Sequence, residues 1–255
     1  MITSKQNPKL KLIRALAGRP KERREEKAFL AEGVRLVEEA FAANWPIRFV
    51  LYADGISERG MELVRRLEQE KIDVEQVSSD LLQSSSETET AQGIIAVLSD
   101  YEFPMPEEAD FILIPDLIRE PGNLGALLRT ASAAGVQAVF LPPETTDAFA
   151  PKVVRAGMGA HFRLPIHSLT WDEIKLKVQG LQICLADMRG QSCWETDLRK
   201  PLALIVGGEA EGASDEARTL ANVTVNIPMP GKMESLNAAV AGSVLMFEVV
   251  RQRSN

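Results

Sequence analysis

The sequence predicts an α/β protein of two domains, the second of them built on a mostly parallel sheet. Two observations predict this fold class. Short apolar runs typical of buried strands alternate with helical patterns, and such alternation is typical of a parallel sheet covered on both faces. The stretch SDYEFPMPEEA, residues 99–109, holds two prolines and four acidic residues without a hydrophobic period, which predicts a linker. The chain of 255 residues is long enough for two domains, at 1–98 and 110–255.

The first domain is predicted to be a small α/β unit. Its strand-like runs are IRFVLYA, IDVEQV and GIIAVLS, at residues 47–53, 72–77 and 93–99. Helical patterns cover about 33–43 and 58–70.

The second domain begins with FILIPDL and continues through four more runs typical of buried strands. These runs are QAVFLP, LQICLADM, ALIVGG and VTVNIPM, the last ending at residue 229. A helix is expected over 235–250, and it is almost wholly small or apolar, so we expect it to be buried. Its small residues would allow another backbone to approach closely; they are Ala238, Ala239, Ala241 and Gly242.

Composition and the start of the chain restrict the class of protein. No apolar run approaches the roughly 20 residues that a membrane span needs, and the N-terminus lacks the apolar core of a signal peptide. The two cysteines, Cys184 and Cys193, have no metal-like spacing. We therefore expect a cytoplasmic protein with no membrane partner and no metal site.

Charge is unevenly distributed along the chain. Residues 1–27 hold nine Lys and Arg against three Glu, a balance of +6, so the net charge of -7 leaves -13 for the rest. A basic arm on an acidic body can attract a polyanion. The alternative is a solvated amphipathic helix, because LKLIRALA also has an apolar face that favours burial. The sequence does not decide between the two.

The stretch GNLGALLRTASAAG, residues 122–135, is typical of a helix with an unusual outer face. Its apolar stripe contains Leu124, Leu127 and Leu128, while Arg129 lies on the other side among small neighbours. Asn123 is a suitable N-cap, and helix N-termini attract anions. Taken alone, the stretch is better explained as a capped helix with a surface arginine.

Two further stretches place polar residues after strands, where open α/β sheets bind ligands. In LIVGGEAEGAS, residues 204–214, a strand runs into paired glycines, but neither G-x-G-x-x-G nor a phosphate loop is present. This absence disfavours a nicotinamide-dependent oxidoreductase. In VNIPMPGKMESLNAAV, residues 225–240, Ser235 and Asn237 open the last helix and are suited to capping its first turn.

The order and form of these stretches resemble the SpoU-type (TrmH-like) RNA 2′-O-ribose methyltransferases of the SPOUT superfamily. The family's three motifs stand here as Asn123, Gly125 and Arg129; as Gly207, Glu209 and Gly212; and as Ile227, Pro228, Met229, Ser235, Leu236 and Asn237. The likeness covers about 110–252. In the N-terminal part, 29–40 and 90–98 look like the family's ribosomal-protein-like substrate-binding domain. One departure is Glu120, where Asp is usual before the proline, and it could alter how that loop is held.

The resemblance implies a fold, a cofactor and a reaction. It implies a trefoil knot in the parallel-sheet domain, S-adenosylmethionine bound in that knot, and a homodimer through the knotted domains. It implies methyl transfer to a ribose 2′-hydroxyl, and the N-terminal domain favours ribosomal RNA as substrate. A non-catalytic RNA-binding or ribosome-assembly protein with the same fold is the alternative. Which RNA and which nucleotide it modifies, and whether a phosphate, water or Arg129 takes the ribose proton, are not readable from the sequence.

The resemblance also assigns residues. The expected catalytic residues are Arg129, Asn123, Glu209, Ser235 and Asn237, with Arg129 on the side of the RNA. The expected cofactor-binding residues are Ala186, Gly207, Gly208, Ile227, Met229 and Leu236.

Overall fold

The structure is a computed structural model that describes residues 1–86, 93–101, 103–104, 106, 108–209, 212–231 and 233–254. Residues 102, 105 and 107 of the predicted linker, and 90–92 of the segment 90–98, lie outside the described residues. The chain forms two compact units. The N-terminal unit comprises Met1–Tyr101 and Phe149–Phe162, and the C-terminal unit comprises Glu102–Ala148 and Arg163–Asn255.

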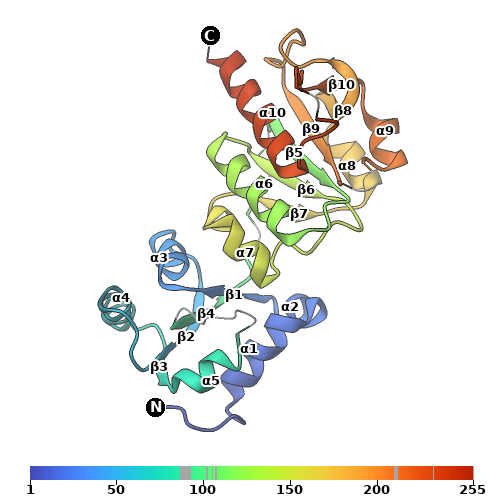
Figure 1. Ribbon diagram of the computed structural model, residues 1–255. Helices are drawn as coiled ribbons and strands as arrows, with labels where there is room; N and C mark the ends of the chain where they lie inside the picture. The colour runs from blue at the N-terminus through green and yellow to red at the C-terminus, as the bar shows by residue number, and fades with distance from the viewer. Residues whose placement is uncertain are drawn as a thin grey trace. The chain divides into compact units, whose positions relative to one another are not determined.

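The N-terminal unit contains a mixed sheet with the strand order β1-β4-β2-β3 (Figure 1). The strands are β1 (Ala28–Glu32), β2 (Ile47–Ala53), β3 (Val74–Val77) and β4 (Ile94–Ser99). β4 pairs antiparallel with β1 and β2, whereas β2 pairs parallel with β3. The three predicted strands of this unit are confirmed, and β1 was not predicted.

Helices surround this sheet. They are α1 (Pro8–Gly18), α2 (Pro20–Glu26), α3 (Val34–Ala42), α4 (Glu58–Gln69) and α5 (Ser79–Gln83). The predicted helices over 33–43 and 58–70 correspond to α3 and α4. α1 starts at Pro8 because the side chain of Asn7 accepts a hydrogen bond from the Lys9 backbone N–H and proline suits the first helical position.

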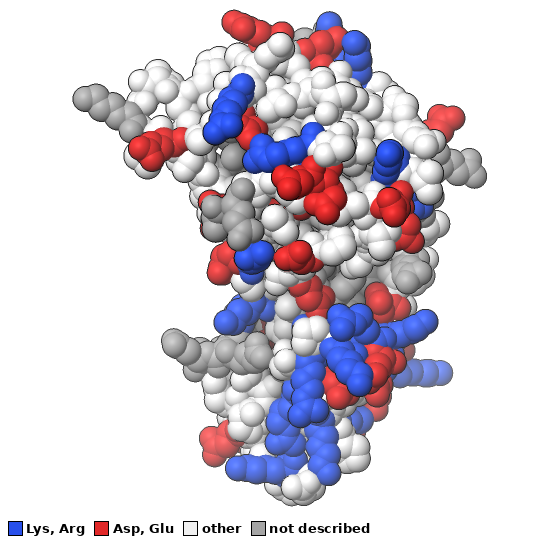
Figure 2. Space-filling model, turned by 90° about the vertical axis from the view of Figure 1, so that its right-hand side faces the viewer, with Lys and Arg blue, Asp and Glu red and all other residues white. Residues whose placement is uncertain are grey.

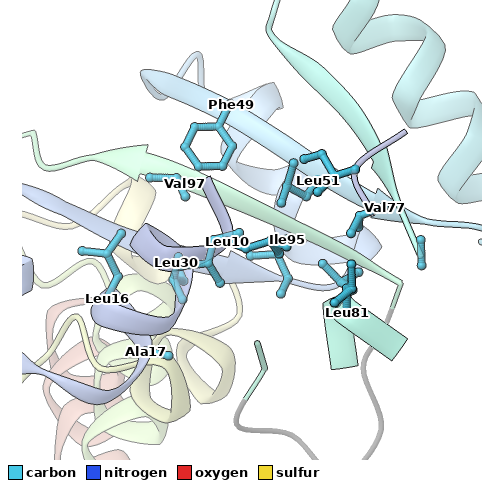
Figure 3. Close-up of a cluster of buried hydrophobic side chains, with 14 of the residues drawn as sticks. Leu10, Leu16, Ala17, Leu30, Phe49, Leu51, Val77, Leu81, Ile95 and Val97 are labelled. Atoms are coloured by element: carbon cyan, nitrogen blue, oxygen red, sulfur yellow. The ribbon is translucent and has the colours of Figure 1, made fainter. Parts of the chain in front are cut away.

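The inner face of α1 is part of the hydrophobic core. Leu10 and Leu16 lie against Leu30 of β1 and against strands β2 and β4 (Figure 3). Leu10, Ile13 and Leu16 are all fully buried. The basic N-terminal segment is therefore a packed helix and not a free arm.

A segment from the middle of the chain completes the N-terminal unit. It contains α7 (Pro151–Gly157) and the 3-10 turn η1 (Ala160–Phe162). The Phe162 ring stacks on Phe29 of β1 with centroids 6.5 Å apart and lies 5.3 Å from the ring of Trp45. Phe149 is also 4.9 Å from Phe29. Residues 149–162 were predicted to belong to the second domain, 110–255, but they pack in the N-terminal unit.

The C-terminal unit is built on a sheet with the strand order β10-β8-β9-β5-β6-β7, and each neighbouring pair is parallel. The strands are β5 (Phe111–Asp116), β6 (Ala138–Leu141), β7 (Ile166–Ser168), β8 (Gln182–Ser192), β9 (Leu202–Gly207) and β10 (Val223–Asn226). The prediction of a mostly parallel sheet in this domain is confirmed.

Helices cover both faces of this sheet. On one face α8 (Trp171–Lys177) and α9 (Asp215–Leu220) pack against alternate strand residues such as Ile112 and Ile205. On the other face α6 (Pro121–Ala133) and α10 (Ala238–Arg253) lie side by side (Figure 1). A hydrogen bond of 2.9 Å between the hydroxyls of Thr130 and Ser243 joins the two helices.

The small residues of α10 pack inside the C-terminal unit. A Cβ added at Gly242 would meet the side chain of Leu127 in α6, and it would lie 3.2 Å from that of Val206 in β9. Within one chain, the expected burial of α10 applies to its inner side, whereas Val240, Val244 and Phe247 of its outer face are exposed. At Gly242 the close approach is to α6 and β9 of the same chain.

Two further observations concern membrane-spanning helices and the cysteines. Among the described residues, no helix is both long and apolar enough to cross a membrane. Cys184 and Cys193 are buried, free thiols.

Candidate functional site

A cavity of about 640 Å³ lies in the C-terminal unit beside the middle of β8 and the carboxyl ends of β9 and β10. Its volume is in the range usual for small-molecule and cofactor sites. The lining includes every residue expected to bind cofactor, namely Ala186, Gly207, Gly208, Ile227, Met229 and Leu236. It also includes Glu209 and Ser235 from the expected catalytic set.

The paired glycines after β9 are required by close backbone approach. A Cβ at Gly207 would lie 2.6 Å from the backbone nitrogen of Ala213, and one at Gly208 would meet the carbonyl oxygen of Leu117. The loop after β9 folds back on itself, with reciprocal backbone hydrogen bonds of 3.0 and 3.1 Å between Gly208 and Gly212. Gly212 has φ +72°, which favours glycine. Any side chain at 207 or 208 would push this loop out of place.

Three of the expected catalytic residues form one hydrogen-bonded network. The Asn123 Nδ2 donates to Glu209 Oε1 at 2.6 Å, and the Asn237 Nδ2 lies 2.6 Å from the same oxygen. The Asn237 Nδ2 is also 3.0 Å from Asn123 Oδ1. The network joins the start of α6, the loop after β9 and the start of α10. Since Glu209 also lines the cavity, the network lies at the edge of that cavity.

Asn237 has a second role as a helix cap. Its Oδ1 accepts hydrogen bonds from the backbone N–H groups of Ala239 and Val240 at 2.9 and 3.2 Å. The expected capping role of Asn237 is therefore confirmed. Because its oxygen is held by the helix, its amide group is fixed with the donor toward Glu209.

The expectation that Asn123 is the N-cap of its helix is wrong. α6 begins at Pro121, and its N-cap is Glu120, whose carboxylate accepts from the Gly122 backbone N–H at 3.4 Å. Asn123 lies inside the first turn, so its side chain is available to Glu209. The unusual Glu120 thus caps the helix.

Arg129 lies on the exposed side of α6, opposite the buried Leu124, Leu127 and Leu128. Within the part of the chain that the structure describes, it forms no hydrogen bond or ion pair. It does not line the cavity and does not join the network around Glu209. Ser235 is exposed and lines the cavity.

Asp116 is a buried acidic residue that was not predicted from the sequence to belong to the site. It ends β5 beside Gly207 of β9, and its Oδ2 accepts from the Ser214 backbone N–H at 2.6 Å. Its Oδ1 is buried without a hydrogen-bond partner among the described residues, and burial raises the pKa of this carboxyl. A carboxyl group ending the apolar run FILIP was the signal that could have identified it. By holding Ser214, Asp116 fixes the far end of the loop that contains Glu209.

An ion pair forms part of the cavity wall. Arg218 Nη1 donates to Asp187 Oδ2 at 2.8 Å, and both residues line the cavity. The backbone N–H of Arg189, together with Arg218, lowers the pKa of the Asp187 carboxyl, so it is ionised at neutral pH. Among the described residues no group of three or more His, Cys, Asp or Glu is arranged to hold a metal ion.

Comparison with known proteins matches the two parts of the chain to two family models. Residues 110–247 match the SpoU rRNA Methylase family. Residues 7–96 match the MRM3-like substrate binding domain.

Two relatives and one solved structure illustrate matches over almost the whole chain. RlmP of Bacillus subtilis (strain 168), a 23S rRNA (guanosine(2553)-2'-O)-methyltransferase, is 34% identical over 97% of this chain and 98% of its own. The 23S rRNA (uridine(2479)-2'-O)-methyltransferase of Streptomyces viridochromogenes is 33% identical over 99% of this chain and 92% of its own. The crystal structure of the SpoU methyltransferase AviRb of Streptomyces viridochromogenes, in complex with AdoMet, has a TM-score of 0.85. It is 30% identical and covers 98% of this chain and 99% of its own. The motifs, the parallel sheet and these matches together show that the chain belongs to the SpoU rRNA methylase family.

Proposed function

We propose that this protein transfers a methyl group from S-adenosylmethionine to a ribose 2′-hydroxyl of ribosomal RNA. The observation that carries the proposal is Glu209, which lines the cavity and also binds Asn123 and Asn237. A cofactor pocket and a polar network suited to hold a ribose therefore share one residue. The 2′-O-methyltransferase names of RlmP and of its Streptomyces relative support the same reaction on 23S rRNA.

The cavity fits the proposed cofactor in size and in chemistry. Apolar side chains of Ile227, Met229 and Leu236 line it beside strand-end backbone, which suits an adenosine group. The carboxylates of Asp187 and Glu209 suit a positively charged sulfonium. We assign Ala186, Gly207, Gly208, Ile227, Met229 and Leu236 to the binding of S-adenosylmethionine. The AdoMet complex of AviRb, which shares this fold, supports the assignment.

The reaction depends mainly on the alignment of the ribose oxygen with the methyl carbon. When bound, S-adenosylmethionine would supply a methyl carbon on a sulfonium, and its transfer to the ribose oxygen would break the S–C bond and release S-adenosylhomocysteine. We assign Asn123, Glu209, Ser235 and Asn237 to positioning the ribose. The cap bonds of Asn237 to α10 hold its amide still, so that this part of the network is preorganised.

Arg129 is proposed to bind the target phosphate or the developing alkoxide. A guanidinium is effectively never deprotonated in proteins, so Arg129 does not act as the base. The ribose proton passes instead to the phosphate or to water. The exposure of Arg129, without an acidic partner among the described residues, leaves its charge available to an RNA group.

Further parts of the proposal concern architecture and setting. We place a trefoil knot in the C-terminal unit, as the resemblance to the SpoU-type family implies. We assign RNA binding to the domain at 1–98 and catalysis to the domain at 110–255, with residues 99–109 as the linker between them. Residues 149–162 pack in the N-terminal unit. The match of 7–96 to a substrate binding domain supports that division. The exposed stripe of Val240, Val244 and Phe247 on α10 supports a homodimer, and two free buried thiols suit the cytoplasm.

The test is methyl transfer to unmodified large-subunit ribosomal RNA made by transcription. The purified protein with S-adenosylmethionine should convert one nucleotide to its 2′-O-methyl form, detected by mass spectrometry of the nucleosides. The phosphodiester bond after that nucleotide should resist alkali, since its 2′-hydroxyl is blocked. RNA binding without methylation would favour the non-catalytic alternative. Calorimetric titration should show binding of S-adenosylmethionine and none of NAD.

A further inference from the structure

Lysine and arginine side chains gather on the N-terminal unit over α1 and α2 (Figure 2). The nine cations of residues 1–27 belong to these two helices and their flanking residues. The rest of the chain carries a formal charge of -13, so this surface has a sign opposite to that of the remainder. Such a local field attracts polyanions even when the whole protein is acidic.

Two of the nine cations are structural. Lys9 Nζ lies 2.5 Å from Asp73 and 2.5 Å from Glu75, which ties α1 to β3 and its approach. Arg23 is buried, and its Nη1 donates to the carbonyl oxygens of Leu16 and Ala17 at 2.6 and 3.2 Å. Arg23 thereby fixes α2 against the C-terminal end of α1. The remaining cations therefore lie on two helices that these contacts hold in place.

Two more cations are paired with acids of their own helix region. Arg19 lies 3.5 Å from Glu22, and Lys21 lies 3.5 Å from Glu25. The other five have no carboxylate partner among the described residues. These five, which we call the unpaired set, are Lys5, Lys11, Arg14, Arg24 and Lys27.

The unpaired set contains a compact group at the start of α1. Arg14 Nη2 donates to the backbone oxygen of Lys5 at 2.5 Å, and Lys11 lies one turn before Arg14 on the same side of the helix. Like charges at this spacing repel each other and destabilise a helix slightly. Their repulsion would be relieved by an anionic ligand.

We propose that the outer face of α1 and α2 holds the RNA substrate by its phosphates, through the unpaired set. This inference rests on the proposed function, because it names where the RNA of that reaction is held. RNA is favoured over an anionic membrane because a membrane-binding helix presents apolar residues to the lipid. Here Met1 is the sole exposed large hydrophobic residue in 1–27, and the apolar side of α1 is buried in the core.

The test compares RNA affinity over a series of salt concentrations for the full-length protein and a variant. The variant replaces Lys5, Lys11, Arg14, Arg24 and Lys27 with Gln. Each lost phosphate contact should make the plot of log affinity against log salt shallower by about 0.7 for single-stranded RNA, so a slope loss of up to about 3.5 is expected. The probe is protein-free large-subunit ribosomal RNA.

Two controls distinguish the loss of phosphate contacts from a general loss of positive charge and from a loss of folding stability. A matched variant replaces five exposed cations of the C-terminal unit, namely Arg163, Lys175, Lys177, Arg199 and Lys200, and should keep the wild-type slope. Lys9→Gln should lower the melting temperature, because Asp73 and Glu75 lose their partner, but should leave the slope unchanged. Binding of S-adenosylmethionine should be the same in all variants.

The outcomes distinguish this inference from the proposed function. If the wild type methylates RNA but the unpaired-set variant keeps its salt slope, the surface inference is overturned and the function stands. If the salt slope becomes shallower in the unpaired-set variant while neither the wild type nor any variant methylates RNA, the RNA-binding surface is supported and the proposed function is contradicted. Equal slope losses in the unpaired-set and matched variants would show a nonspecific charge effect, which overturns the inference. Stronger sedimentation of the wild type with phosphatidylserine vesicles than with RNA would also overturn it.

Discussion

Asn123 shows how one side chain changes its role once the chain is folded. In the sequence it precedes an apolar period, where an asparagine is typical of an N-cap. In the structure Glu120 takes the cap and Pro121 starts the helix, so Asn123 turns to Glu209, which is 86 residues away. Local propensity cannot reveal this contact, because it depends on strands β5 and β9 being neighbours in the sheet. The family resemblance placed Asn123 and Glu209 in the same catalytic set, but it did not predict the hydrogen bond between them.

Arg129→Ala should abolish methyl transfer while the affinity for S-adenosylmethionine stays within a few-fold. The reason is that Arg129 lies outside the cavity lining and has no partner among the described residues. Arg129→Lys should fail nearly as badly, because a point charge does not reproduce a planar fork of donors. Single-turnover methylation and calorimetry measure the two properties separately.

A control for Arg129 is available on the same domain. Arg199 is also exposed and pairs only with the neighbouring Asp197 among the described residues, at 2.8 Å. Arg199→Ala should leave both methyl transfer and cofactor affinity unchanged. Substantial activity in Arg129→Lys would contradict the proposed contact with phosphate or alkoxide. A large loss of cofactor affinity in Arg129→Ala would instead move Arg129 to the cofactor.

At the scale of elements, β2 was predicted with its exact bounds, whereas β1 and the first residue of α10 were not. The run at 47–53 coincides with β2, because a continuous β-branched and aromatic pattern has few alternatives. β1 was missed because its five residues lead directly through Gly33 into α3, and one helical pattern masked the change. The helix expected from 235 starts at Ala238, where Asn237 provides the cap.

The burial of α10 was predicted from composition, and composition does not say which neighbour covers a face. Gly242, one of the small residues of α10, lies against Leu127 and Val206 of its own domain. The outer stripe of Val240, Val244 and Phe247 follows the spacing of one helix face, at i, i+4 and i+7. A substitution at Gly242 would therefore report on folding and not on the dimer.

Val244→Glu combined with Phe247→Glu should convert the proposed dimer to monomers at micromolar concentration. Both side chains are exposed, by 39% and 50%, so the fold should tolerate the change, whereas an apolar interface would not tolerate two buried carboxylates. Sedimentation equilibrium measures the state, and circular dichroism checks the fold. Leu176→Glu on α8, where the residue is 66% exposed, is the matched control and should remain dimeric. A wild-type monomer, or a dimer unaffected by the double change, would contradict the α10 interface.

At the scale of the whole molecule, the two-unit organisation was expected, but the course of the chain between the units was not. Sequence patterns divide a chain into consecutive segments, so residues 149–162 were included with the strands on either side of them. The structure packs this segment on β1, where Phe29 is buried beside Phe149 and Phe162. A contact between residues more than a hundred positions apart leaves no periodic signal in either stretch.

Phe162→Ala in the full-length protein should destabilise the N-terminal unit selectively. Phe162 is 4% exposed and contacts Phe29 and Trp45, so its truncation should cost about 3–5 kcal/mol, the range for a buried phenylalanine. Hydrogen exchange should show faster opening of the β1 amides, whose strand packs against this segment, while amides of β9 in the C-terminal unit keep their protection. Leu176→Ala, at an exposed position of α8, should change neither set. Loss of protection confined to β9 would show that residues 149–162 belong energetically to the C-terminal unit. Loss in both sets together would show that the two units unfold as one.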